Sequence, residues 1–124
     1  MSTARSRLGA RGERAARAYL EGRGYEIVAT NFRCPRGEVD IIARDGVCLV
    51  FVEVRTRRSP GQYGAPEESL SKGKRDRLVA TAETYIQSSP SLPEQWRIDL
   101  VAVRLDSRGA IGQVEHIENA IQLS

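Results

Sequence analysis

The stretch that decides the fold is GEVDIIARDGVCLVFVEVR, residues 37–55. Two runs rich in valine, isoleucine, leucine and phenylalanine flank Asp45-Gly46, and this dipeptide between β-rich runs is the strongest short-range signal of a β-hairpin. If Asp45 and Gly46 form the two-residue turn, Arg44 pairs with Val47, and counting outward gives the register. The sequence therefore predicts two antiparallel strands joined by a tight turn.

The predicted register gathers the three acids of this hairpin on one face, because side chains alternate between the faces of a sheet. Asp40 is expected opposite Phe51, and Glu38 is expected opposite Glu53. The other face is wholly apolar and must be buried; it carries Val39, Ile41, Ala43, Cys48, Val50, Val52 and Val54.

The clustered carboxylates need a positive partner. Diagonal neighbours such as Asp40 and Glu53 lie about 7–8 Å apart or less, and unpaired like charges at such distances repel by roughly 2–3 kcal/mol. The compensation could come from Arg55 on the same face, from Arg33 or Arg36 in the preceding loop, or from a divalent cation. The ligands would all be oxygen atoms, which favours a hard cation, Mg²⁺ or Mn²⁺, over zinc.

The rest of the chain predicts helices on either side of this hairpin in the sequence. Hydrophobic periodicity and turn residues place the elements as follows: a helix at 4–22, a strand at 25–30, a polar loop at 31–37, a mobile connection at 56–68, a helix at 71–87, and strands at 96–105 and 112–117. A strand, helix, strand connection gives a parallel pair beside the antiparallel hairpin. We therefore expect an α/β fold with a central mixed sheet of about five strands, flanked by helices.

Length and composition predict one soluble domain, residues 1–124, with 40% hydrophobic and 28% charged residues. No apolar run is long enough to span a membrane and the N-terminus has no apolar signal segment, so no membrane association and a cytoplasmic location are expected. Two cysteines, Cys34 and Cys48, are too few for a disulfide framework and are expected to be reduced thiols.

The distribution of charge indicates a polyanionic partner more clearly than the net charge of +3 does. Six arginines face only two glutamates in the first 23 residues, and a second basic stretch follows the hairpin. Basic stretches on both sides of an acid cluster are typical of a nucleic-acid footprint, although solvated helix faces are the alternative. The candidate contact residues are Arg33, Arg36, Arg57, Arg58, Lys72, Lys74 and Arg75.

The segments GERAARAYLEGRGYEIVATNFRCPRGEVDIIARDGVCLVFVEVRTR, YGAPEESLSKGKRDRL and RIDLVAV resemble the YraN family over nearly the whole chain. That family belongs to the restriction-endonuclease-like superfamily and is related to archaeal Holliday-junction resolvases. The superfamily motif, PD-(D/E)xK, is similar to Asp40 followed by Glu53-Val54-Arg55. The resemblance also implies that Glu13, on the inward stripe of the first helix, joins the site as the additional helical glutamate of the resolvases.

In the mechanism that this resemblance implies, Asp40 and Glu53 hold Mg²⁺, with help from Glu13, and Glu38 supports the site. The ion lowers the pKa of a bound water and neutralises charge on the scissile phosphate. Arg55 departs from the motif lysine: it can grip a phosphate but cannot act as a base. Lys72 and Lys74 could bring an ammonium group from the second helix.

Three functions remain open at this point. The first is a Mg²⁺-dependent endonuclease acting on structured or branched DNA, with Glu13, Asp40, Glu53 and Arg55 as catalytic residues and a homodimer expected by analogy with the resolvases. The second is a nucleic-acid-binding module of the same fold without turnover, and the third is an interaction protein whose acids are only salt-bridged.

Three further residues have ordinary structural explanations. Asp99 is expected to form an ion pair with Arg97 or Arg33, and His116 is expected to have no catalytic role. Trp96 could stack on a nucleobase but is more often a core aromatic at the start of a strand.

Overall fold

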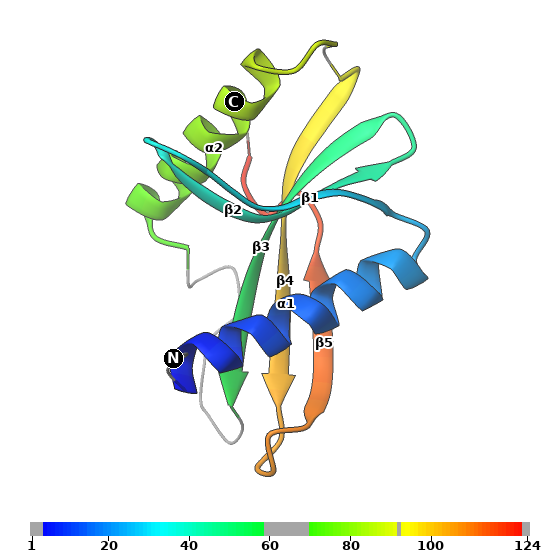
Figure 1. Cartoon of the computed structure of the whole chain (residues 1–124), viewed down its shortest axis with the longest axis vertical. Helices are drawn as coiled ribbons and strands as arrows, with labels where there is room; N and C mark the ends of the chain where they lie inside the picture. The colour runs from blue at the N-terminus through cyan, green and yellow to red at the C-terminus, as the bar shows by residue number, and fades with distance from the viewer. Residues whose placement is uncertain (1–3, 59–69, 92, 123–124) are drawn as a thin grey trace.

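The fold is built on a five-stranded mixed sheet with the strand order β1-β2-β3-β4-β5. The computed structural model (Figure 1) describes residues 4–58, 70–91 and 93–122. Its elements are α1 (Ala4–Gly22), β1 (Glu26–Cys34), β2 (Gly37–Asp45), β3 (Cys48–Arg58), α2 (Lys72–Gln87), β4 (Gln95–Leu105) and β5 (Ile111–Ile117). Only the β3–β4 pair is parallel, because α2 lies between those strands in the chain. The expected α/β class and mixed sheet are confirmed.

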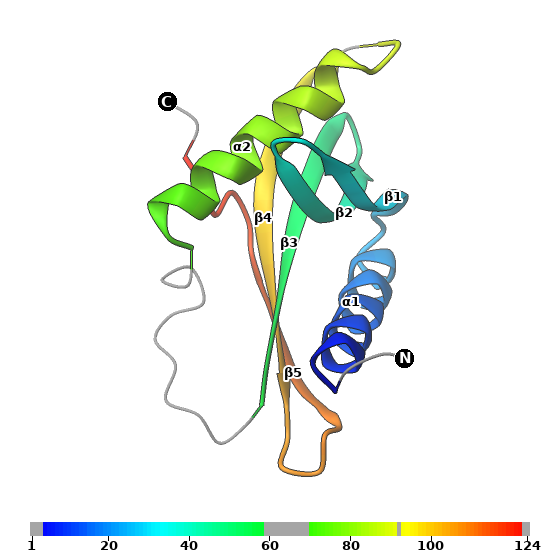
Figure 2. The ribbon, with the colours of Figure 1, turned by 60° about the vertical axis from the view of Figure 1, so that its left-hand side comes forward.

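The two helices cover opposite faces of the sheet, as Figures 1 and 2 show together. On one face Ala16 and Leu20 of α1 pack against Val50 and Val52. On the other face Leu78 and Ala82 of α2 belong to a second core cluster, which also contains Phe51, Leu49 and Ile98. Consecutive β3 residues therefore alternate between two cores, as the period of two requires.

Helix α1 crosses β3 closely at Gly12. A Cβ atom added at Gly12 would overlap the side chain of Thr56 on β3, so the close approach of helix and strand requires glycine here. Helix α2 begins at a conventional N-cap, since the hydroxyl of Ser71 accepts a hydrogen bond from the backbone N–H of Lys74 at 3.2 Å. These two features set the positions of Glu13 and Lys74.

The predicted hairpin exists, but its predicted register is wrong by two residues. The structure pairs Asp45 with Cys48 and Ile42 with Phe51, so Gly46 and Val47 are the central turn residues. Of these two only Gly46 has a positive φ, 61°, as in a Gly-X type II′ turn, whereas an Asp-Gly type I′ turn would need positive φ at both positions. The two-residue shift preserves the faces of β3 and brings Asp40 towards Glu53 instead of Phe51.

The face assignment fails at two neighbouring positions of the hairpin, since Asp40, expected on the face of Phe51, lines a cavity with Leu8 and Glu13 of α1. Val39 was expected on the apolar face with Ile41, yet it belongs to the core cluster beneath α2, while Ile41 packs on the side of α1. The β2–β3 pairing extends only as far as Ile41 and Val52, so the two strands separate just before Asp40. Beyond Ile41, the side chains of β2 therefore need not lie on the same faces as those of β3.

Two other predicted boundaries differ from the structure. Strand β1 continues to Cys34 through the expected polar loop, with a register shift between Ile27 and Ala29 and with Asn31 at a φ of 55°. Strand β3 reaches Arg58, so residues 56–58 of the expected mobile connection 56–68 are strand; its remainder, 59–68, lies outside the described residues. Both cysteines are free thiols, as expected. Within the described residues no helix is long and apolar enough to cross a membrane.

Candidate acidic site and its basic surroundings

Three acids from three elements meet where β2 and β3 separate: Glu13 of α1, Asp40 of β2 and Glu53 of β3. The backbone N–H of Val54 donates a hydrogen bond of 2.7 Å to Oδ2 of Asp40, which fixes this carboxylate at the strand gap. Glu13 and Asp40 line a cavity of about 250 Å³ on the side of α1, together with Leu8 and Gly9. Glu53 is buried, with 8% of its surface exposed.

The proximity of the acids shows in their pKa values. Burial, followed by the neighbouring charge of Asp40, raises the pKa of Glu53 from 4.5 to about 7. Burial and then Asp40 also raise the pKa of Glu13, while a hydrogen bond of 3.4 Å from the Asn31 side chain opposes that shift. Asp40 thus lies between two carboxyl groups that both resist ionisation beside it, which is the condition that a bound cation relieves.

Two cationic side chains reach Glu53. Arg55 Nη2 and Lys74 Nζ each lie 3.5 Å from its Oε2 atom. Lys74 comes from the first turn of α2, whereas Lys72 pairs with Asp76 on the exposed side of the helix at 2.9 Å. The expectation that a lysine of the second helix could reach the acids is therefore confirmed for Lys74 and not for Lys72.

Arg55 is mostly buried beside the acids, with 18% of its side chain exposed. Its Nε atom is buried and has no hydrogen-bond partner among the described residues. A buried donor without a partner costs about 1–3 kcal/mol of stability. The unpaired Nε of Arg55 therefore favours the binding of a further hydrogen-bond acceptor at the site.

The donor set fits a loosely held hard cation and not a closed metal cage. In the described part of the chain no three His, Cys, Asp or Glu side chains form a metal-binding group. Mg²⁺, however, is usually held by one or two carboxylates and keeps several water ligands. Asp40 and Glu53, whose carboxyl groups interact directly, are the two residues that would hold it.

Glu38, the expected supporting acid, lies at the edge of the site. It forms a salt bridge of 3.0 Å with Arg33, and both side chains are largely exposed. Its charge contributes the smallest of the effects that raise the pKa of Glu13. Glu38 and Arg33 thus neutralise one another on β2 and β1, and Arg33 does not compensate the buried pair.

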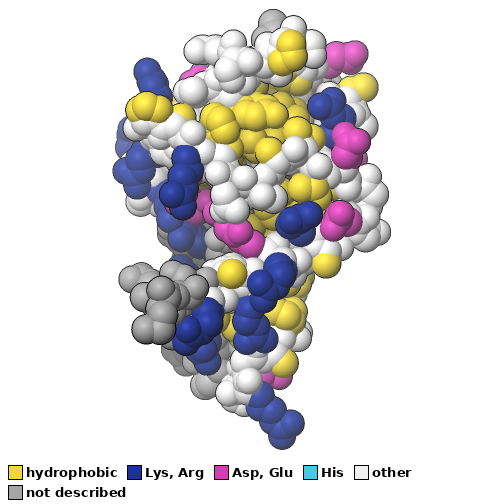
Figure 3. Space-filling view, viewed as in Figure 1, with side chains coloured by type: hydrophobic (Ala, Val, Ile, Leu, Met, Phe, Trp, Pro, Cys, Tyr) yellow, Lys and Arg dark blue, Asp and Glu magenta, His cyan; other side chains and the backbone are white. Residues whose placement is uncertain are grey.

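The remaining basic candidates lie on the surface around the acids. The exposed ones are Arg36, Arg58, Lys72 and Arg75, while Arg57 is half-buried and donates to the Thr56 carbonyl oxygen. Figure 3 shows basic side chains on both sides of a smaller acidic group on one face of the molecule.

A separate buried network surrounds Asp99, which is fully buried. Its carboxylate accepts a bond of 2.9 Å from Arg97 Nε, lies 2.7 Å from His116 Nε2, and accepts the N–H of Asn119 at 2.9 Å. The side-chain and backbone hydrogen bonds of this network overcome the effect of burial and lower the pKa of Asp99. The expected ion pair with Arg97 is confirmed, and His116 takes part in this network, away from the three acids.

This network also holds α1 against the sheet. The hydroxyl of Tyr19 on α1 lies 3.3 Å from Nδ1 of His116 on β5, and Arg97 donates to the Tyr25 hydroxyl at 2.7 Å. Sequence reasoning missed Tyr19 and Tyr25, because their partners are distant in the chain. It also missed Asn31, although asparagine in a polar strand segment is a known signal for positive φ.

The sheet, the two covering helices and the acids at the strand gap define an α/β protein consistent with the restriction-endonuclease-like fold. The sequence profile described as Uncharacterised protein family UPF0102 matches residues 12–103, and the chain belongs to this family.

Relatives of the same family match over nearly their whole length. A UPF0102 protein of Dehalococcoides mccartyi is 45% identical over 98% of both chains. UPF0102 proteins of Geobacter metallireducens and Roseiflexus castenholzii are 40% and 44% identical, over 100% and 98% of this chain and 99% and 98% of theirs.

Proposed function

We propose that this protein is a metal-dependent endonuclease that hydrolyses phosphodiester bonds of structured or branched DNA. The observation that carries the proposal is the carboxyl pair of Asp40 and Glu53: burial, and then the charge of Asp40, raise the pKa of Glu53 to about 7. Two carboxylates that repel each other when both are ionised are stabilised by a divalent cation. The positive side chains of Arg55 and Lys74 beside them would attract a phosphate.

Each residue has a distinct part in this proposal. Asp40, oriented by the Val54 N–H, and Glu53 hold Mg²⁺ or Mn²⁺, and Glu13 accepts from a water at the same cavity. When bound, the ion supplies an activated water and neutralises charge on the phosphate. Arg55, which is permanently charged, grips the phosphate with its guanidinium group.

Lys74 takes the place that the superfamily motif gives to the lysine of its second strand. Arg55 occupies that strand position, and Lys74 brings an ammonium group to within 3.5 Å of the same Glu53 carboxylate from another element. An ammonium group can donate a proton in a reaction, whereas a guanidinium stays protonated. The substitution of Arg55 for lysine is therefore compatible with turnover.

The substrate class and assembly rest on the resemblance to the resolvases. Four-way DNA has two equivalent strands to cut, so a homodimer with two acidic sites suits it. Arg36, Arg58 and the other basic candidates would contact phosphates without reading sequence, which predicts binding that weakens with salt.

The test is a cleavage assay on four-way, forked and linear DNA with Mg²⁺ or Mn²⁺. We expect Asp40→Asn and Glu53→Gln to lose cleavage, while the matched control Glu38→Gln, which removes an exposed charge paired with Arg33, keeps it. Equal nicking by wild type and both site variants would refute the proposal. A metal-binding titration by calorimetry gives a second measurement: Mn²⁺ should bind wild type and not Asp40→Asn.

The second candidate function is a DNA-binding module without turnover. It is favoured by Arg55 at the motif lysine position and by the absence of a three-ligand metal group in the described residues. Salt-sensitive binding of branched DNA, unchanged in Glu53→Gln and without cleavage in either metal, would select this function instead.

A further inference from the structure

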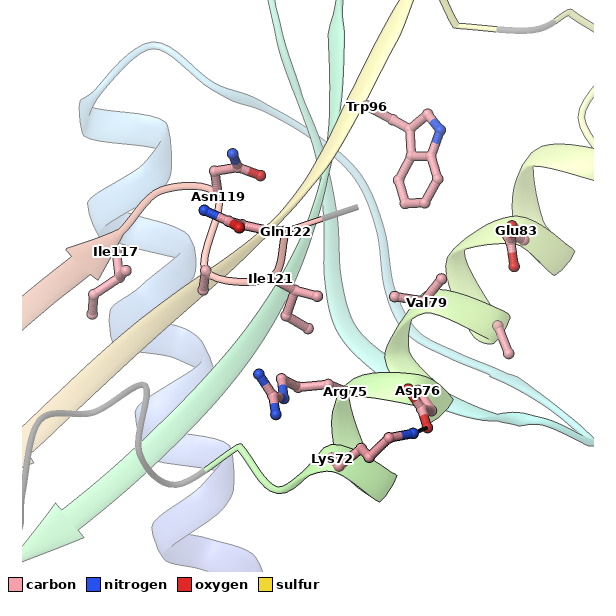
Figure 4. A pocket seen from close by; sticks show the side chains of 12 residues that line it. Lys72, Arg75, Asp76, Val79, Glu83, Trp96, Ile117, Asn119, Ile121 and Gln122 are labelled. Carbon is pink, nitrogen blue, oxygen red and sulfur yellow. Dashed lines mark hydrogen bonds and ion pairs between the residues drawn. The ribbon is translucent and has the colours of Figure 1, made fainter. Parts of the chain in front are cut away.

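A second hollow lies outside the acidic site, between α2 and the segment after β5 (Figure 4). It has a volume of about 930 Å³, within the range of small-molecule sites. Its lining combines the indole of Trp96, apolar side chains such as Ile121, and polar groups from Arg75, Asn119 and Gln122. A large aromatic ring beside a cation is the combination on which single-stranded nucleic acids stack a base and bind a phosphate.

Trp96 is placed to offer its ring to a ligand. It projects from the start of β4 towards α2, as Figure 4 shows, and it remains half-buried, not fully enclosed. Phe51 supports it from the core in an edge-to-face contact, with ring centroids 5.7 Å apart. A ring that is fixed on one side and borders a cavity on the other loses little entropy when a base stacks on it.

The charges of the hollow suit a phosphate at one end. Lys72 neutralises Asp76 at 2.9 Å, which leaves Arg75 as an exposed cation without a partner among the described residues. Glu83 lies further along α2, where its carboxylate can accept from an exocyclic amino group of a base. The basic end and the acceptor end are thus separated along the helix.

The hollow and the acidic site share the first turn of α2. Lys74 points to Glu53, whereas its neighbours Lys72 and Arg75 line the hollow. Consecutive helical residues point in different directions, so one turn can contact two successive parts of one strand. A DNA strand that places a phosphate at Glu53 can follow this turn into the hollow.

From this arrangement we propose that the hollow is a subsite for an unpaired segment of single-stranded DNA, in which a base stacks on Trp96 and the adjacent phosphate binds Arg75. The inference rests on the proposed function for its choice of DNA. It adds that the substrate carries an unpaired strand next to the bond at the acidic site.

The chain supplies its own probe, because Trp96 is its single tryptophan. The full-length protein is titrated in EDTA with a twelve-residue oligothymidylate, with a blunt duplex of equal length and with thymidine monophosphate, while the fluorescence of Trp96 is followed. We expect saturable quenching by the single strand, quenching by the mononucleotide only at much higher concentration, and weak or no quenching by the duplex.

Variants then separate stacking from general charge attraction. Trp96→Leu should bind the oligothymidylate about tenfold more weakly, followed by the anisotropy of a dye on the DNA, and Trp96→Phe should retain most of the affinity. Arg75→Ala should weaken binding several-fold and reduce its salt dependence, whereas Arg108→Ala, at the opposite end of β4, removes the same charge and should change affinity little. Thermal melting of each variant verifies that it is folded.

Several results would overturn the subsite. These are single-strand binding that leaves Trp96 fluorescence unchanged, equal affinity of Trp96→Leu and wild type, the absence of single-strand binding, or equal quenching by the mononucleotide. The subsite and the nuclease proposal can fail separately. Cleavage that depends on Asp40, without quenching of Trp96, would refute only the subsite. Quenching of Trp96 without any cleavage would refute only the nuclease.

Discussion

Replacing Glu53 by glutamine should stabilise the metal-free protein at alkaline pH and leave it nearly unchanged in acid. The pKa of Glu53 rises from 4.5 to about 7, mainly through burial and then through the charge of Asp40. A shift of about 2.5 units corresponds to roughly 3 kcal/mol, since each unit is worth about 1.4 kcal/mol. Glutamine resembles the protonated acid and avoids this cost.

The sign follows from proton linkage. Between pH 4.5 and about 7 the folded protein holds a proton on Glu53 that the unfolded chain has released, so the free energy of unfolding falls as pH rises through this window. Above about pH 7 Glu53 is ionised in the folded protein too, and the full cost of its buried charge lowers the free energy of unfolding. The glutamine variant should therefore gain up to about 3 kcal/mol at pH 8, or roughly 10 °C in melting temperature, and little at pH 4.5.

Urea unfolding at pH 4.5, 6, 7 and 8 in EDTA measures the effect, with Glu38→Gln as the matched exposed control. Repeating the series with Mg²⁺ adds a second readout, because a cation at Asp40 and Glu53 favours the ionised pair. Wild type should recover stability at pH 8 with Mg²⁺, and Glu53→Gln should not.

An equal stability difference between wild type and Glu53→Gln at pH 4.5 and pH 8 would refute the linkage to Glu53. A variant that is less stable at pH 8 would also refute it, because the contacts with Arg55 and Lys74 would then outweigh burial and the repulsion from Asp40. A Mg²⁺ effect of equal size in both proteins would place the ion elsewhere.

Three further outcomes are expected. Lys74→Met should lower the cleavage rate by roughly 10²-fold or more, while Lys72→Met should keep most of it, as measured by single-turnover kinetics. Asp99→Asn should lower the free energy of unfolding by about 3 kcal/mol at pH 7, measured in urea, because it removes the buried carboxylate that pairs with the mostly buried Arg97. Gly12→Ala should cost about 1–3 kcal/mol, by melting, since its methyl group overlaps Thr56; an unchanged stability would show that α1 can move away freely.

The period of two explains why the central strands could be predicted so well. Parity placed Phe51 and Glu53 on one face of β3 and Val50 and Val52 on the other, whatever the turn. The turn itself could not be settled by composition, since Asp45-Gly46 and Gly46-Val47 are both acceptable two-residue turns. The predicted pairing of residues across the hairpin was therefore wrong, whereas the predicted faces of β3 were correct.

The rest of the candidate site depends on tertiary placement that no local pattern contains. Val39 lies in the other core because the pairing of β2 with β3 ends at Ile41, and no alternating pattern in the sequence marks that end. The contact of Lys74 with Glu53 depends on the connection that brings α2 across the sheet, and sequence reasoning could name the lysine only as a candidate. Asp99 and His116 likewise meet through strand pairing alone.

The contact between Tyr19 and His116 joins residues 97 positions apart. During synthesis from the N-terminus, the helix that carries Glu13 emerges first, but the strand that supplies its anchor emerges last. A chain interrupted before residue 116 would contain all three acids and still lack the bond that ties their helix to Asp99. The hydrogen-bond network that ties α1 to Asp99 can therefore form only after β5 has been made.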